Sequence, residues 1–181
     1  MLRLKEKTVV ILIAEGYHDH EFWFPYYRFK EEGAKVIVAA PEAGIIYGEG
    51  RNGKDGLPAK ADIAISELPE ELPDILFLPG GIFGPLTLRN MCEVREYVKN
   101  CADSGVLVCA ICHAPWILTA ADVLRGRKVS CPEDMQWDVT GAGAVYSRDD
   151  VTLDGNILTA IYFGFLPEMF RVMFNGGFKF K

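Results

Sequence analysis

The sequence predicts an α/β fold, with residues 1–181 forming one domain on a doubly wound, mostly parallel sheet with helices on both faces. Short apolar runs bounded by turn residues alternate with helical segments, which is the order of elements in such sheets. The apolar runs are continuous rather than alternating, as expected of strands buried on both faces. The length of 181 residues suits one domain, and 50% hydrophobic with 24% charged residues is an ordinary globular composition.

The individual elements follow from the apolar runs and the turn residues between them. A helix is expected after the first strand and ends at Gly33, because glycine readily takes the conformation that follows a helix. Pro25 lies in the early part of this helix, which therefore begins near Pro25 or kinks there. The glycine-rich stretch 44–60 is expected to be a hairpin or a long loop. Strands are predicted over residues 8–14, 35–40, 74–78 and 106–111, and helices over residues 92–104, 113–124 and 166–174.

Composition excludes several classes of protein. The net charge is −6 and no cluster of Lys and Arg stands out, so we expect no nucleic-acid partner. The apolar run near the N-terminus is too short to span a membrane, and no cleavage site follows it, so we expect no membrane partner and a cytoplasmic protein. An odd number of cysteines in a chain of this length is typical of free thiols in a reducing compartment. The five cysteines are Cys92, Cys101, Cys109, Cys112 and Cys131.

Cys112 is the strongest candidate for a catalytic residue. It follows a buried strand and precedes a predicted helix, and the small residues Ala110 and Ala114 stand two places to either side, as a nucleophile elbow requires. Pro115 suits a first helical turn. The N-terminus of that helix is expected to favour the thiolate and to lower the pKa of Cys112. Most free cysteines are instead small buried hydrophobes, which is the interpretation we prefer for Cys109. Cys109 and Cys112 also form a C-x-x-C pattern, but the first cysteine lies inside a strand rather than at a helix start.

Several motifs together resemble the PfpI/ThiJ superfamily, which includes intracellular cysteine peptidases of archaea and a glyoxalase/deglycase linked to Parkinson's disease. The resemblance covers nearly the whole chain and implies a flavodoxin-like fold, a nucleophile elbow and assembly with itself as a homodimer or a larger ring. The motifs are Ala110-Ile111-Cys112-His113-Ala114-Pro115, Leu78-Pro79-Gly80-Gly81, Gly16-Tyr17-His18-Asp19-His20-Glu21, Pro25-Tyr26-Tyr27-Arg28, Val123-Leu124-Arg125-Gly126-Arg127-Lys128 and Asp154-Gly155-Asn156.

The resemblance assigns roles to residues around the cysteine. Glu21 matches the family's acid that hydrogen-bonds the elbow cysteine, and a carboxyl in that position can share a proton with sulfur. Gly80 and Gly81 lack side chains, so their N–H groups can approach a ligand and form an oxyanion hole with the N–H of His113. His113 matches the histidine proposed for the peptidases' triad, but adjacent helical residues do not face each other. The acid that orients it in the peptidases is absent from residues 82–86.

Other polar and aromatic residues near the predicted site are harder to assign. The cluster from His18 to Glu21 invites a metal site, but residues two apart on a helix point apart, and we prefer a helix-capping stretch with no metal. Aromatic residues, among them Tyr17, Trp116 and Tyr162, are expected to line a pocket more apolar than that of the relatives, although most aromatic residues are core.

The sequence therefore predicts a cofactor-free, cysteine-dependent enzyme that acts on small reactive carbonyls, of glyoxalase or deglycase type. Catalysis is assigned to Cys112, Glu21 and His113. Two alternatives remain open. One is an intracellular cysteine peptidase, and the other is a redox-sensing or chaperone-like stress protein in which Cys112 is oxidised without turnover.

Overall fold

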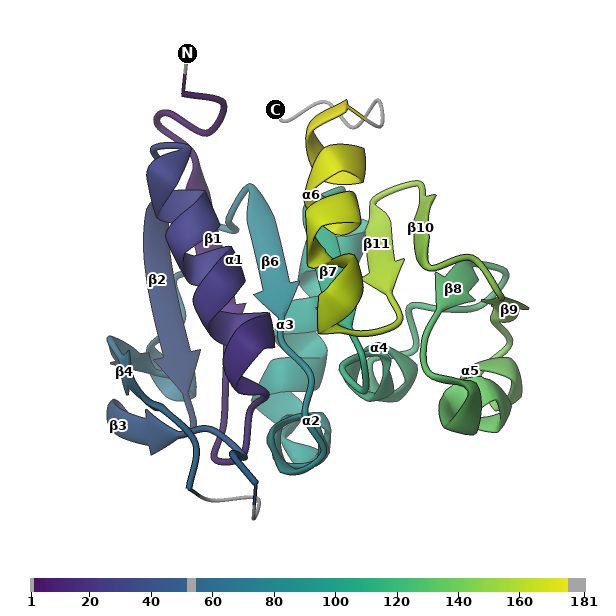
Figure 1. Cartoon of the computed structure of the whole chain (residues 1–181), viewed down its shortest axis with the longest axis horizontal. Helices are drawn as coiled ribbons and strands as arrows, with labels where there is room; N and C mark the ends of the chain where they lie inside the picture. The colour runs from purple at the N-terminus through teal and green to yellow at the C-terminus, as the bar shows by residue number, and fades with distance from the viewer. Residues whose placement is uncertain (1, 52–54, 176–181) are drawn as a thin grey trace.

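A seven-stranded sheet forms the centre of the protein, and its strand order is β10-β11-β7-β6-β1-β2-β5 (Figure 1). The computed structural model describes residues 2–51 and 55–175. All neighbouring strands of this sheet are parallel except β10 and β11, so the predicted flavodoxin-like, mostly parallel sheet is confirmed. The strands are β1 (Thr8–Leu12), β2 (Lys35–Ala40), β5 (Ile63–Ala64), β6 (Ile75–Leu78), β7 (Leu107–Ile111), β10 (Val151–Asp154) and β11 (Ile157–Ala160).

Helices cover both faces of the sheet, which explains why its strands are apolar without interruption. In β1, Val9 and Ile11 pack toward one face, with α1 and α6, while Val10 and Leu12 pack toward the other, with α2, α3, α4 and α5. Every second residue is thus buried against a different helical layer. The helices are α1 (Asp19–Glu31), α2 (Phe83–Asn90), α3 (Cys92–Asp103), α4 (Pro115–Ala120), α5 (Gln136–Gly141) and α6 (Leu166–Asn175).

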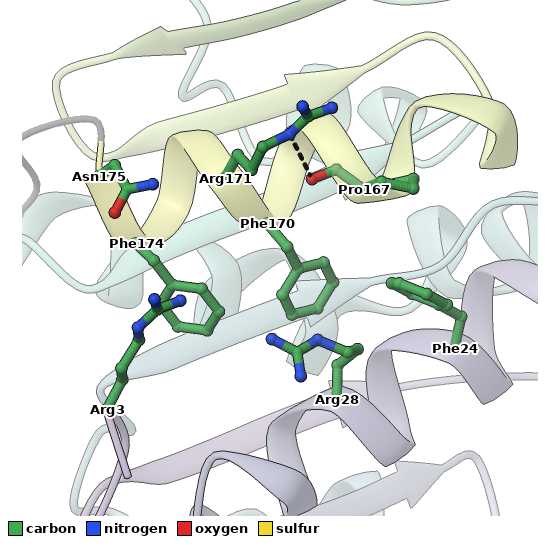
Figure 2. A pocket seen from close by; sticks show the side chains of 8 residues that line it. All are labelled: Arg3, Phe24, Arg28, Pro167, Phe170, Arg171, Phe174 and Asn175. Carbon is green, nitrogen blue, oxygen red and sulfur yellow. Dashed lines mark hydrogen bonds between the residues drawn. The ribbon is translucent and has the colours of Figure 1, made fainter. Parts of the chain in front are cut away.

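Arginine and phenylalanine side chains line a cavity of about 510 Å³ between α1 and α6. Figure 2 shows these side chains. The Arg3 guanidinium lies 4.9 Å from the ring centre of Phe174, and that of Arg28 lies 5.8 Å from the ring centre of Phe170. Arg28 also pairs with Glu31 at the end of α1 and with Glu32, the residue that follows it. The described residues that line this cavity include none of the predicted site residues, and we interpret it as part of the helix packing.

Two predicted helices differ from the observed ones at their ends. The first begins at Asp19, six residues before Pro25, and Gly33 follows it with a φ of 87° as expected. The helix predicted over residues 113–124 is much shorter, because α4 ends at Ala120 and Asp122 takes a left-handed φ of 53°. Aspartate is one of the residues that tolerate this conformation, so it can end a helix where no glycine stands.

Several elements are absent from the sequence-based assignment. Gly84 and Pro85 disguise α2, but Pro85 lies in its first turn, where a missing N–H costs nothing, and Gly84 lets the helix approach the Tyr17 backbone closely. The hairpin expected within residues 44–60 is confirmed as the antiparallel pair β3 (Gly44–Tyr47) and β4 (Pro58–Ala61). The short parallel pair β8 (Lys128–Ser130) and β9 (Val145–Ser147) was not expected, nor were α5 and the strands β10 and β11.

Asn156 joins the turn before β11 to the turn before β7. Its side-chain amide donates to the carbonyls of Ala102 and Val106, both at 2.8 Å. We expect Asn156→Ala to lower the free energy of unfolding by about 1–3 kcal/mol, because two hydrogen bonds to partly buried carbonyls are lost. Urea unfolding measures the change. Asn90→Ala, which removes one hydrogen bond from an exposed amide, should stay within about 0.5 kcal/mol of the wild type. Equal effects of the two substitutions would contradict this role of Asn156.

Candidate active site

The candidate site lies where three neighbouring central strands end. β7, β6 and β1 are adjacent in the sheet and parallel, so their carboxyl ends lie at one edge. Cys112 follows β7, Gly80 and Gly81 follow β6, and Glu21 lies in the first turn of α1, which follows β1. From β1 the chain continues to β2 on one side of the sheet, and from β6 it continues to β7 on the other side. Ligands of doubly wound sheets bind at such a change of direction.

Cys112 occupies a strained turn between β7 and α4. Its φ is 59°, which a residue with a side chain rarely adopts. The Cys112 N–H donates to the carbonyl of Ala160 at 3.0 Å, and the Ala114 N–H donates to that of Ile111 at 3.0 Å. These bonds tie the turn to the ends of β11 and β7. The side chain is half-buried, so the thiol is fixed by its backbone and remains reachable.

The pKa of the Cys112 thiol is raised, which contradicts the expectation of a lowered pKa. Burial is the largest cause, and the nearby Glu21 carboxylate raises the pKa further. The backbone N–H groups of Gly81 and His113 act in the other direction, because they stabilise the thiolate. The dipole of α4 does not offset the effect of burial on the pKa of Cys112, since this helix has only six residues.

Glu21 is a fully buried carboxyl beneath the cysteine. Its exposed fraction is 0%, and its Oε2 accepts a hydrogen bond of 2.9 Å from the Gly80 N–H. Burial raises the pKa of Glu21 to about 8, while the Gly80 N–H and the Cys112 thiol lower it. The carboxyl thus holds its proton at neutral pH and releases it just above, so it can both accept and give a proton.

The two glycines after β6 have different roles. A side chain on Gly80 would place its Cβ 2.5 Å from Glu21 Oε2 and 2.7 Å from Cys112 Cβ, so the acid and the thiol approach each other only because this position is bare. The Gly80 N–H is engaged by Glu21. Gly81 has a φ of 91°, and its N–H faces the sulfur together with that of His113.

The imidazole of His113 contacts the Cys112 thiol, although adjacent residues of a helix are expected to point apart. Its Nδ1 lies 3.3 Å from Cys112 Sγ, because the left-handed turn at Cys112 removes both residues from helical geometry. The other ring nitrogen, Nε2, lies 3.3 Å from Oδ2 of Asp134. Residues 82–86 hold no acid, as the sequence indicates, and the acid beside His113 comes instead from a segment later in the chain.

Asp134 is the residue of this cluster that sequence reasoning missed. It lies in Glu133–Met135, a 3₁₀ helix of one turn that follows β8, and its side chain is 71% exposed. No motif surrounds it, and its approach to His113 depends on the placement of β8 beside the sheet. An acceptor at Nε2 favours the tautomer in which Nδ1 is free to take a proton from sulfur. Because the Asp134 side chain is exposed, solvent screens the charge of its carboxylate.

The predicted aromatic residues occupy different environments. Tyr17 is 1% exposed and its hydroxyl donates to the carbonyl of Leu57, so it belongs to the core rather than to an open pocket surface. Trp116 packs on the His113 ring with centroids 4.9 Å apart. Tyr162 is 43% exposed and packs edge-on against Phe163 and Phe165. Trp116 thus borders the cluster of Cys112 and His113, and Tyr162 lies at the surface.

His18 and His20 form an aromatic cluster. Both rings stack on Phe163, with centroids 5.0 and 5.1 Å apart. Among residues 2–51 and 55–175, no group of three metal-binding side chains lies close enough to hold an ion. Burial lowers the pKa of His18, which is therefore neutral at pH 7.

Comparison with known proteins shows the family to which this chain belongs. The model of the DJ-1/PfpI family matches residues 7–175. The chain belongs to the DJ-1/PfpI family. The deglycase TK1284 of Thermococcus kodakarensis is 37% identical over 163 residues, which cover 90% of this chain and 95% of that protein. The putative cysteine protease YraA of Bacillus subtilis is 32% identical, over 85% of this chain and 88% of that protein.

A solved DJ-1/PfpI structure supports the fold. Drosophila melanogaster DJ-1beta superposes with a TM-score of 0.84 at 22% identity, covering 94% of this chain and 91% of that one. The family model and the sequence identities confirm the predicted resemblance to the PfpI/ThiJ superfamily. Within the part of the chain that the structure describes, no helix combines the length and apolar character needed to cross a membrane.

The buried Glu21 makes the stability of this DJ-1/PfpI protein depend on pH. The unfolded chain releases this proton near pH 4.5 and the folded protein near pH 8, so the folded state holds more protons between these values and loses stability as pH rises. Glutamine keeps the shape without the charge. The free energy of unfolding of Glu21→Gln, relative to wild type, should therefore increase from about pH 4.5 to about pH 8 by on the order of 2 kcal/mol or more.

Urea unfolding at a series of pH values measures this difference. Glu71→Gln changes an exposed carboxyl and serves as the control, with a difference from wild type that stays flat over the same range. A flat difference for Glu21→Gln as well would show that the folded protein does not retain the Glu21 proton.

Proposed function

We propose that this chain is a cofactor-free, cysteine-dependent enzyme that acts on small reactive carbonyls, of glyoxalase or deglycase type. The observation that carries the proposal is the placement of the Cys112 thiol between two groups that can hold its proton, the ring of His113 and the buried carboxyl of Glu21. The name of the Thermococcus kodakarensis relative, a deglycase, supports this class of substrate.

Capture of the carbonyl is the first step of the proposed reaction. The Cys112 thiol gives its proton to Nδ1 of His113, and the sulfur attacks the aldehyde carbon of a 2-oxoaldehyde. A carbon–sulfur bond forms as the carbonyl π bond opens. The oxygen gains negative charge beside the N–H groups of Gly81 and His113, which stabilise it as an oxyanion hole. Return of the proton to that oxygen gives a neutral hemithioacetal.

Glu21 carries out the second step as the proton carrier. Its carboxylate takes the proton from the carbon bonded to sulfur and delivers it to the neighbouring carbonyl carbon. The hydroxyl proton on the first carbon passes to the oxygen of the second. The two shifts convert the hemithioacetal into a thioester with a neighbouring hydroxyl group, oxidising one carbon and reducing the next, with no external oxidant. Water then cleaves the thioester, which releases a 2-hydroxy acid and restores the thiol. A pKa of about 8 allows Glu21 to serve as acid and base near neutral pH.

A cysteine peptidase is the second candidate, and Asp134 favours it. A peptidase needs a thiol, a base and a group that orients the base, and Cys112, His113 and Asp134 form such a series at 3.3 Å for each contact. The Bacillus subtilis relative is named a putative cysteine protease. We rank this candidate second, because an exposed aspartate is a weak orienting group for a histidine that must protonate an amine leaving group.

Purified protein should turn over methylglyoxal faster than any fluorogenic peptide. Cys112→Ala should lower kcat/KM for methylglyoxal by about a thousandfold or more, because the nucleophile is lost. Lactate formation and peptide fluorescence are the two measurements. Cys92→Ala removes an exposed thiol and is the matched control, with activity unchanged. Strong Cys112-dependent cleavage of peptides without action on methylglyoxal would reverse the ranking of the two candidates.

Asp134→Asn tests how much the orienting acid contributes. We expect kcat/KM for methylglyoxal to fall by no more than about tenfold, since the side chain is mostly exposed and its charge is screened. Asp138→Asn, an exposed aspartate on α5, should leave activity unchanged. A loss as large as that of Cys112→Ala would mean that His113 and Asp134 act as one unit and would favour the peptidase.

A further inference from the structure

Glu49 brings a carboxylate to the mouth of the Cys112 site. It follows β3, and its N–H donates to the carbonyl of Tyr17 at 2.8 Å, which fixes the backbone. Its Oε2 accepts a hydrogen bond of 3.3 Å from the Ile82 N–H, and its Oε1 lies 3.8 Å from Nε2 of His18. The side chain is 23% exposed, so the charge is held by protein on one side and faces solvent on the other.

A single glycine separates this carboxylate from the thiol. The N–H of Gly81 faces Cys112, while a Cβ built on Gly81 would lie 3.1 Å from Glu49 Oε2. A molecule that reaches the sulfur beside the Gly81 N–H therefore passes close to Glu49. Consistent with this, the charge of Glu49 raises the pKa of both Cys112 and Glu21.

Glu49 has one ion-pairing neighbour among the residues that the structure describes. Among the described residues, no Lys or Arg side chain forms an ion pair with Glu49, and its one ion-pairing neighbour, His18, is neutral at pH 7 because burial lowers its pKa. Asp134 adds a second carboxylate on the His113 side. The Arg89 guanidinium lies 5.8 Å from the ring centre of Trp116, beyond His113. Glu49 and Asp134 thus place two carboxylates around Cys112 and His113.

We propose that Glu49 is a specificity-determining residue that selects by charge, admitting neutral and cationic compounds to Cys112 and rejecting anionic ones. The inference rests on the proposed function for its substrate class: carbonyl compounds without a carboxylate are accepted, and 2-oxo acids are rejected. A fixed charge near the thiol changes the local concentration of charged reactants, and added salt screens the effect.

Alkylthiolating reagents of different charge test the inference without relying on turnover. Methanethiosulfonates carry either an ethyltrimethylammonium or an ethylsulfonate group on the same reactive sulfur. The Cys112 thiolate attacks that sulfur, a disulfide forms, and methanesulfinate leaves. Peptide mass mapping gives the rate at Cys112 for each reagent, and the exposed Cys92 in the same sample is an internal reference. Any change in the pKa of Cys112 cancels in the ratio of the two rates.

The ratio of the cationic to the anionic rate should fall about fivefold in Glu49→Gln and about twenty-five-fold in Glu49→Lys, as expected for removing and then reversing one charge near the sulfur in water. Glutamine can still accept the bond from Ile82 N–H, so the loop is retained. Glu71→Lys makes the same change in charge at an exposed site and should leave the Cys112 ratio unchanged. Salt at about 1 M should remove most of the wild-type preference.

Two results would overturn the inference. One is a wild-type ratio at Cys112 equal to that of a neutral small thiol, and the other is a ratio that Glu49→Lys leaves unchanged. Turnover gives an independent comparison, since Glu49→Lys should raise kcat/KM for glyoxylate relative to methylglyoxal. If the reagents show the preference but the wild type turns over no carbonyl compound, the charge selection stands and the proposed function fails. If carbonyls are turned over without the preference, only the role of Glu49 fails.

Discussion

The hydrogen bond between the Gly80 N–H and the buried Glu21 carboxyl is the contact on which the site depends. It joins the end of β6 to the first turn of α1 at 2.9 Å, directly beneath Cys112. A carboxyl at 0% exposure is costly unless it is neutral or well bonded. Gly80 must be bare to permit the contact, which favours the ionised carboxyl, while burial raises the pKa of Glu21 to about 8. The acid, the loop and the thiol are therefore one arrangement, in which a change to any member disturbs the other two.

Local sequence signals were sufficient for the centre of the fold. The apolar runs of β1, β6 and β7 and the small residues around Cys112 each act within a few positions, so pattern reasoning located the strands and the elbow. Helix α2 was missed because Gly84 and Pro85 look unfavourable until their places in the first turn are known. The helix predicted after Cys112 is longer than the observed one, because Asp122, not a glycine, takes the left-handed conformation beyond its end.

The site was predicted less completely than the fold, because its missing members come from distant segments. Asp134 and Glu49 reach the cluster through the placement of β8 and of the β3–β4 hairpin, and no local pattern marks either residue. The contact between Cys112 and His113 was not predicted, because adjacent residues point apart in a helix but need not do so in a left-handed turn. The predicted lowering of the pKa of Cys112 is also wrong. Burial and the neighbouring Glu21 carboxylate raise this pKa by more than the dipole of α4 can lower it.

The left-handed backbone at Cys112 sets stability against function. A φ of 59° at a residue with a side chain costs on the order of 1–3 kcal/mol, and glycine would adopt the same turn without this cost. Selection for thermal resistance alone would therefore remove the nucleophile first, because the substitution that relaxes the elbow also deletes the thiol. A programme of laboratory evolution aimed at a hardier protein must accordingly hold this position fixed and seek its gains elsewhere, for example in the packing between α1 and α6.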